Sequence, residues 1–225
     1  MKLNLIEQFL LIALDDDEGR FVTDTTYLYN GFAGAILMEL AILDKIELQK
    51  KKVVVTGKPD TEEPVLDQSI KAIQNLKEGK TVGFWIGTFN ANAKDIKEIV
   101  LQELIDKGIL RREKGKIFWV IPYVKYTTDN PVPENKVRAQ IQDIIMDQTD
   151  PEPRDLMLLS LIDVCELKRE AFRSKEVFRK AGKRIVALTQ PNALSNVLDP
   201  DIQKIHVAVM AATRSAVTAS TTPMD

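Results

Sequence analysis

The longest apolar run of the chain constrains its fold more than any other feature. Residues 27–43 are almost continuously apolar, and they include four small residues that would let a neighbouring helix approach closely: Gly31, Ala33, Gly34 and Ala35. Glu39 interrupts the run and Asp44 ends it, so it falls short of the ~20 apolar residues that cross a bilayer. We therefore expect a buried helix, and a chain of 225 residues is long enough to bury ~70% of its unfolded surface around it.

Apolar residues spaced three and four apart predict further helices. The first covers residues 3–14, and others cover about 65–76, 94–108 and 135–146. The segment Asp155–Val164 is apolar on all sides, which is typical of a central helix. Two more helices are expected before the C-terminus. The first has its apolar residues in a single stripe along one face, and the second begins at Asp199-Pro200. The expected inward residues of that stripe are Ala171, Phe178, Ala181, Ile185 and Leu188.

Two short hairpins interrupt the helices. In the first, residues 45–48 and 53–55 flank a polar turn; in the second, Ile109-Leu110 and residues 117–121 flank a turn at Arg111–Lys116. The predicted fold is mainly α, a compact single helical domain with two β-hairpins over residues 1–218 and a flexible tail over 219–225. Because each hairpin follows a helix, a winged-helix nucleic-acid-binding protein stays open as an alternative.

Motifs for catalysis are missing from the sequence. It has no Gly-x-Ser-x-Gly elbow, no phosphate-binding loop and no His-Glu-x-x-His helix. With one cysteine and one histidine, only Cys165 and His206 could form a nucleophilic pair, and both lie in apolar helices. We expect a buried thiol and an imidazole on a helix surface. We expect no enzyme, cofactor or metal, although an enzyme with an unrecognised carboxylate site stays a third alternative.

The cysteine content and the charge distribution indicate which compartment and which binding partners to expect. One cysteine cannot form an internal disulfide, which fits a reducing compartment, and the N-terminus lacks a signal-peptide pattern. The net charge of −2 argues against a wholly basic nucleic-acid coat. Locally, Lys168–Arg184 has eight basic and two acidic residues. Together with Lys50–Lys52, Lys94, Lys97, Arg111 and Arg112, this stretch offers enough cations for an anionic membrane surface.

Four segments resemble the Golgi phosphoprotein 3-like family when taken in order and spacing over residues 3–215. They are Leu14-Asp15-Asp16 with Glu18-Gly19, then Gly31–Ala41, Leu104–Leu110 and Arg154–Leu161. The resemblance implies a mainly helical, non-enzymatic domain that binds phosphatidylinositol 4-phosphate at membranes. In eukaryotic members it also implies an adaptor role, the retention of glycosyltransferases in Golgi membranes.

The resemblance also implies where the lipid headgroup would bind. Two basic residues of the family's headgroup pocket fall on Lys94 and Lys97, but its aromatic residue falls near Asp24 and its arginine on Ala33. An aspartate repels phosphate, and lysine lacks the planar fork of arginine. These departures favour a prokaryotic-type member without Golgi-specific partners.

The second hairpin resembles the family's apolar hairpin, which takes part in self-association. Its anchor would be Ile117–Val120, with Phe118 and Trp119 as the membrane or self-association residues. The expected protein is cytoplasmic and peripherally membrane-associated. Its expected partners are an anionic membrane surface and, through this hairpin, a second copy of the chain, and nucleic acid is not expected.

Overall fold

The computed structural model describes residues 2–15, 18–58, 60–117 and 121–221. Its helices and strands confirm a mainly α fold with small antiparallel sheets. In chain order the elements are α1 (Leu5–Ala13), α2 (Thr25–Ile42), β1 (Ile46–Gln49), β2 (Lys52–Val55), α3 (Pro64–Gln74), β3 (Lys80–Thr81), α4 (Val82–Ala91), α5 (Ala93–Asp106), β4 (Leu110–Ile117), β5 (Ile121–Thr128), α6 (Val132–Ile145), α7 (Pro153–Val164), α8 (Lys168–Ala171), α9 (Lys175–Leu188), α10 (Pro191–Leu194) and α11 (Pro200–Thr221).

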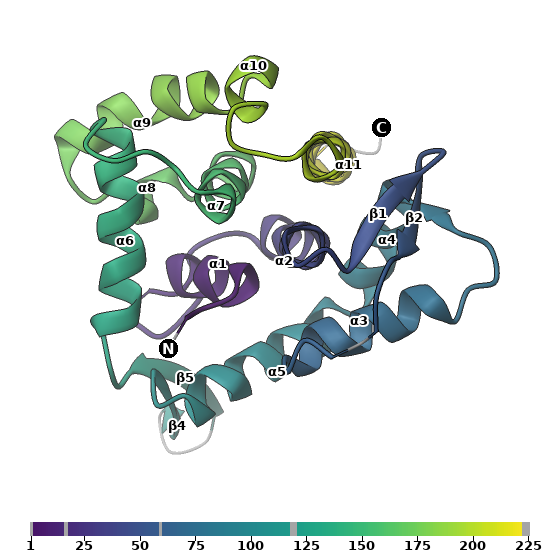
Figure 1. Ribbon diagram of the computed structural model, residues 1–225. Coiled ribbons are helices and arrows are strands. Elements are labelled where there is room, and N and C mark those ends of the chain that lie inside the picture. The colour runs from purple at the N-terminus through teal and green to yellow at the C-terminus, as the bar shows by residue number, and fades with distance from the viewer. Residues whose placement is uncertain (1, 16–17, 59, 118–120, 222–225) are drawn as a thin grey trace.

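Helices α1 and α2 lie in the middle of the molecule (Figure 1). Helices α3, α4 and α5 cover one side of this pair, α7 and α11 cover the other, and α9 packs on the outer side of α7. Helix α6 closes one end, and the β1–β2 hairpin lies at the opposite end. The hairpin of β4 and β5 projects at a corner, beyond the end of α5.

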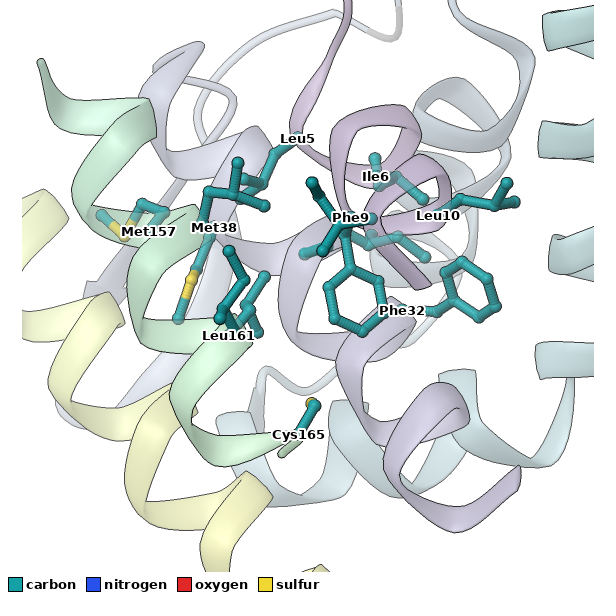
Figure 2. Packing of buried hydrophobic residues seen from close by; sticks show 14 of the residues in the cluster. Leu5, Ile6, Phe9, Leu10, Phe32, Met38, Met157, Leu161 and Cys165 are labelled. Carbon is teal, nitrogen blue, oxygen red and sulfur yellow. The ribbon is translucent and has the colours of Figure 1, made fainter. Parts of the chain in front are cut away.

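The core forms where α1, α2 and α7 meet, and Figure 2 shows it from close by. Phe9 of α1 and Phe32 of α2 are fully buried and meet edge to face, with ring centroids 5.7 Å apart. Met157 and Leu161 of α7 approach from the other side. Helix α2 is buried along nearly all of its length, as its apolar run predicts.

Glycines in α2 permit this close packing. A Cβ atom at Gly31 would lie only 2.1 Å from Cζ of Phe9, and one at Gly34 would meet Leu161 and Val209 at 3.2 Å. The small residues of the run are therefore in the positions where α1, α7 and α11 come nearest to the α2 backbone.

One buried ion pair ties the three central helices together. Arg154 of α7 donates two hydrogen bonds to Glu39 of α2, Nε to Oε2 at 3.0 Å and Nη2 to Oε1 at 2.6 Å. The backbone N–H of Leu5 also donates to Glu39 Oε2, at 3.0 Å. The Glu39 side chain is 2% exposed. The charge that interrupts the apolar run is thus satisfied inside the core.

The first hairpin lies where it is predicted, but the second is displaced along the chain. Strands β1 and β2 pair from Ile46↔Val55 to Gln49↔Lys52, and β3 extends them to a three-stranded sheet. The predicted turn at Arg111–Lys116 is wrong, because these residues belong to β4 and pair with β5. The physical reason is pairing across the two strands. Glu113 of β4 faces Lys125 of β5 and forms an ion pair with it at 3.2 Å, so the polar residues of β4 have partners on the opposite strand.

Three further expectations need correction. Helix α4 was not predicted, yet its Trp85 is 1% exposed and belongs to the core. Phe178 does not face inward but is 41% exposed, and Val177 takes the buried position on α9. His206 is not on a helix surface but is buried on α11, whereas Cys165 is a buried thiol as expected.

Candidate functional site

Lys94 and Lys97 lie near the N-terminus of α5, three residues apart, a spacing that places them on one face of the helix. Lys94 is exposed and has no ion pair with any described residue. Lys97 is partly buried, and its Nζ lies 5.6 Å from the centroid of the Phe21 ring. The two predicted lysines therefore do lie together, beside an aromatic side chain that the sequence reasoning did not select.

A third cation comes from the second hairpin. Glu98 lies between Lys97, whose Nζ is 3.9 Å from Oε1, and Arg112, whose Nη2 is 3.6 Å from Oε2. The hydroxyl of Tyr126 donates to the same Oε2 at 3.1 Å, and the guanidinium of Arg112 lies 5.7 Å from the Tyr126 ring centroid. One carboxylate thus holds two cations from distant segments. We name Lys94, Lys97 and Arg112, with the rings of Phe21 and Tyr126, the basic corner.

The loop after α1 positions the aromatic part of the basic corner. Phe21 forms an isolated β-bridge with Leu14, and the backbone N–H of Tyr126 donates to the Gly19 carbonyl at 3.2 Å. Gly19 has a φ of +63°, and a Cβ there would lie 2.6 Å from the Tyr126 carbonyl oxygen. Only glycine fits this close approach of loop and hairpin without strain.

The charges of the basic corner suit an anion. Lys97 and Arg112 contact the Glu98 carboxylate, Lys94 lies one helical turn from Lys97, and Lys94, Glu98 and Arg112 are exposed. Burial and the neighbouring Glu98 carboxylate raise the pKa of Tyr126, so its hydroxyl stays a hydrogen-bond donor. Lysine and arginine donors with this spacing can hold phosphate oxygens, arginine through two parallel hydrogen bonds.

The other two headgroup positions implied by the resemblance contribute nothing to such a site. Asp24 is the N-cap of α2, and its side chain accepts from the backbone N–H of Thr26 at 2.8 Å. Ala33 is fully buried in the core. An aromatic ring is nevertheless present, because Phe21 stands next to Lys97.

The predicted hairpin residues Phe118 and Trp119 lie outside the described residues. The strands that lead to them are paired from Leu110↔Thr128 to Ile117↔Ile121. On this hairpin, hydrogen bonds from Lys125 and Thr127 lower the pKa of Glu113. The hairpin is thereby held by charge pairs across its strands as well as by its backbone ladder.

Half of the cations in the basic stretch at Lys168–Arg184 are neutralised by acidic neighbours. Four of its eight cations form ion pairs with acidic neighbours: Lys168 with Asp163, Arg173 with Glu170, Lys180 with Glu176, and Arg184 with Asp147. Lys175 and Lys183, on α9, have no ion pair with a described residue. Exposed pairs of this kind are typical of an ordinary solvated face.

Cys165 and His206 do not form a pair. Burial raises the pKa of the Cys165 thiol, which donates to the Tyr27 carbonyl at 3.4 Å. His206 Nε2 instead lies 2.8 Å from Ser160 Oγ, whose one proton is donated to the Leu156 carbonyl at 2.7 Å. The imidazole therefore contacts a serine hydroxyl and the thiol contacts a backbone carbonyl, so the two side chains do not form the nucleophilic pair that the sequence allowed.

Comparisons with known proteins show the family of the chain. The model of the family described as Golgi phosphoprotein 3 (GPP34) matches residues 5–217. The chain is also similar to Vacuolar protein sorting-associated protein 74 of Schizosaccharomyces pombe, with 30% identity over 134 residues. That alignment covers 50% of this chain and 40% of the relative, so the match spans less than half the relative's length. Among the described residues, every helix is too short or too polar to cross a membrane.

Proposed function

The chain belongs to the Golgi phosphoprotein 3 family, and from this premise we propose that it is a non-enzymatic peripheral membrane protein. The proposed ligand is an anionic phosphoinositide headgroup, phosphatidylinositol 4-phosphate by resemblance to the family. It binds at the basic corner, on the cytoplasmic surface of a membrane.

One observation carries the proposal: cations from two distant segments gather around Glu98. Lys97 of α5 and Arg112 of β4 approach the two oxygens of that carboxylate at 3.9 and 3.6 Å. A phosphomonoester carries a charge of about −1.5 to −2 at neutral pH, more than a carboxylate, so it competes well for the same cations. Lys94, which has no ion pair with a described residue, adds a further contact.

The hairpin carries a second part of the proposal. Phe118 and Trp119 enter the membrane interface or contact a second copy of the chain, because aromatic side chains favour both environments. By resemblance to the family, the proposal also includes an adaptor role for membrane proteins. Replacement of both aromatic residues by alanine is expected to lower the mass measured by light scattering, if they join two copies, or to weaken liposome binding, if they insert. No change in either measurement would remove the hairpin from the proposal.

Liposome flotation tests the headgroup site. The full chain is mixed with phosphatidylcholine liposomes that contain phosphatidylinositol 4-phosphate, phosphatidylserine at equal charge, or neither. Each basic residue near an anionic surface contributes ~1 kcal/mol, so the double variant K94A/K97A is expected to bind roughly 30-fold more weakly. The double variant K175A/K183A removes the same charge from α9 and is the matched control, expected to float as the unchanged chain does.

The possible outcomes distinguish failure of the proposed headgroup site from failure of lipid binding itself. Failure to float with any anionic liposome would overturn lipid binding altogether. Loss of flotation in K175A/K183A but not in K94A/K97A would keep lipid binding and move the site to α9. Duplex DNA is measured in parallel, because tight binding that falls steeply with added salt, without flotation, would favour the nucleic-acid alternative.

A further inference from the structure

Three carboxylates meet near the C-terminal end of α5, the end opposite Lys94 and Lys97. Glu7 comes from α1, Glu63 is the N-cap of α3, and Glu103 comes from the last turns of α5. One oxygen of each lies within 4.8 Å of those of the other two. Like charges at this separation repel strongly in a partly buried setting, so the cluster requires positive charge.

Lys107 supplies part of that charge. Its Nζ lies 2.6 Å from Glu7 Oε1 and 3.2 Å from Glu63 Oε1. Burial lowers the pKa of Lys107, but hydrogen bonding and attraction to Glu7 and Glu63 outweigh it, so the pKa is raised overall. The side chain is therefore an ammonium ion, and one ammonium stands against three carboxylates.

Glu103 is the carboxylate left without a partner. It is 9% exposed, and neither of its oxygens has a hydrogen-bond partner among the described residues. A buried polar group without a partner is rare in folded proteins, because its lost hydration is uncompensated.

We infer that Glu7, Glu63 and Glu103 form a binding site for a hard divalent cation of the size of Ca²⁺. Carboxylate oxygens are the ligands that Ca²⁺, Mg²⁺ and Mn²⁺ prefer over softer donors. Ca²⁺ binds oxygens at about 2.3–2.6 Å, so oxygens on its opposite sides stand about 4.6–5.2 Å apart, which accommodates this cluster; for Mg²⁺ the limit is about 4.2 Å. The inference goes beyond the proposed lipid binding and does not depend on it.

The surroundings allow a cation and its water ligands to enter. The side chain of Glu63 is 23% exposed and that of Lys107 is 22% exposed, so solvent reaches one side of the cluster. The long Lys107 side chain can turn its ammonium group outward as the cation binds. Both oxygens of Glu63 accept from Lys107 Nζ, at 3.2 and 3.4 Å, so the cation would take the place of this ammonium group.

Isothermal titration calorimetry of the full chain, stripped with a chelator and free of lipid, tests the site with CaCl₂ and then with MgCl₂. One saturable site is expected, with Ca²⁺ bound more tightly. The variant E103Q replaces a ligand with an isosteric amide and is expected to weaken binding at least tenfold. It should fold as well as the unchanged chain, because it removes a buried unpartnered carboxylate.

Two more variants complete the test. E63Q alters the more exposed ligand and is also expected to weaken binding. D106N removes the same charge from the exposed face of α5 and should leave binding unchanged, since Asp106 contacts Gln102 and not the cluster. Ca²⁺ should raise the melting temperature of the unchanged chain but not that of E103Q. The absence of a saturable site, or equal weakening by D106N, would overturn the inference.

Discussion

Gly31→Ala is the sharpest test of how the core is packed. The added methyl group would lie 2.1 Å from Cζ of Phe9 and 2.6 Å from Cε1, well inside the contact distance of two carbon atoms. The Phe9 ring is fully buried and meets Phe32 edge to face at 5.7 Å, so it has no free space into which to move. The substitution therefore overfills the contact of α1 with α2.

Two opposing effects determine how much G31A changes the free energy of unfolding. Overfilling a well-packed core costs typically about 1–3 kcal/mol, and the near-overlap with Phe9 puts this site at the upper limit. Alanine in place of glycine inside a helix gains about 1 kcal/mol. The net destabilisation of G31A should be about 2 kcal/mol, which for a domain of this size lowers the melting temperature by about 4–8 °C.

Thermal unfolding followed by circular dichroism measures this shift, and Gly87→Ala is the matched control. Gly87 lies inside α4, where a Cβ would meet nothing within 4 Å, so only the helix-propensity gain applies. G87A should therefore raise the melting temperature by about 2–4 °C, opposite in sign to G31A.

A double-mutant cycle assigns the cost to one pair of side chains. Phe9→Leu removes Cζ and both Cε atoms, the atoms nearest the new methyl group. In the F9L background, G31A should become stabilising by about 1 kcal/mol, which gives a coupling of about 3 kcal/mol. If G31A stabilises the unchanged chain as G87A does, or if G31A and F9L are additive, the packing argument is refuted.

The remaining predictions concern the buried charges. Glu39→Gln leaves Arg154 buried without its counter-ion and should destabilise the chain by about 3–5 kcal/mol in urea unfolding. Lys204→Met removes one partner of an exposed ion pair and should change the stability by less than about 1 kcal/mol. Equal effects of the two substitutions would contradict the burial of the Glu39–Arg154 pair. Burial, with a smaller contribution from Arg214, lowers the pKa of His206 to about 4, so between pH 6.5 and 4 the unfolded chain binds a proton that the folded chain does not. This histidine should therefore contribute a loss of roughly 3 kcal/mol as the pH falls from 7 to 4, absent in His206→Gln; parallel pH profiles of the two proteins would refute it.

The helices with a clear apolar period could be predicted from the sequence. The buried α2, the all-apolar α7 and the end of α5 at Gly108, whose φ of +67° suits a helix C-terminus, all follow from local rules. Helix α4 contains Gly83 and Gly87, which disfavour a helix, and it forms because burial of its aromatic face outweighs that preference.

The site could be predicted only in part. Lys94 and Lys97 are neighbours on one helix, so their spacing alone places them together. Phe21 and Arg112 join them because the loop after α1 and the second hairpin dock on each other. The hydrogen bond between the loop and the hairpin joins Gly19 and Tyr126, 107 positions apart, and no local pattern encodes it. The wrong prediction of a turn at Arg111–Lys116 had the same cause, because a polar segment whose only partner is a distant strand has the composition of a turn.

The burial of Cys165 makes the protein convenient for site-directed labelling. It is the only cysteine of the chain, it is 0% exposed, and its raised thiol pKa keeps the reactive thiolate scarce. A maleimide reagent should leave the native chain unmodified under folding conditions. A cysteine introduced at any exposed position would then carry the whole label, so fluorescent or spin probes can report on each surface without prior removal of a native thiol.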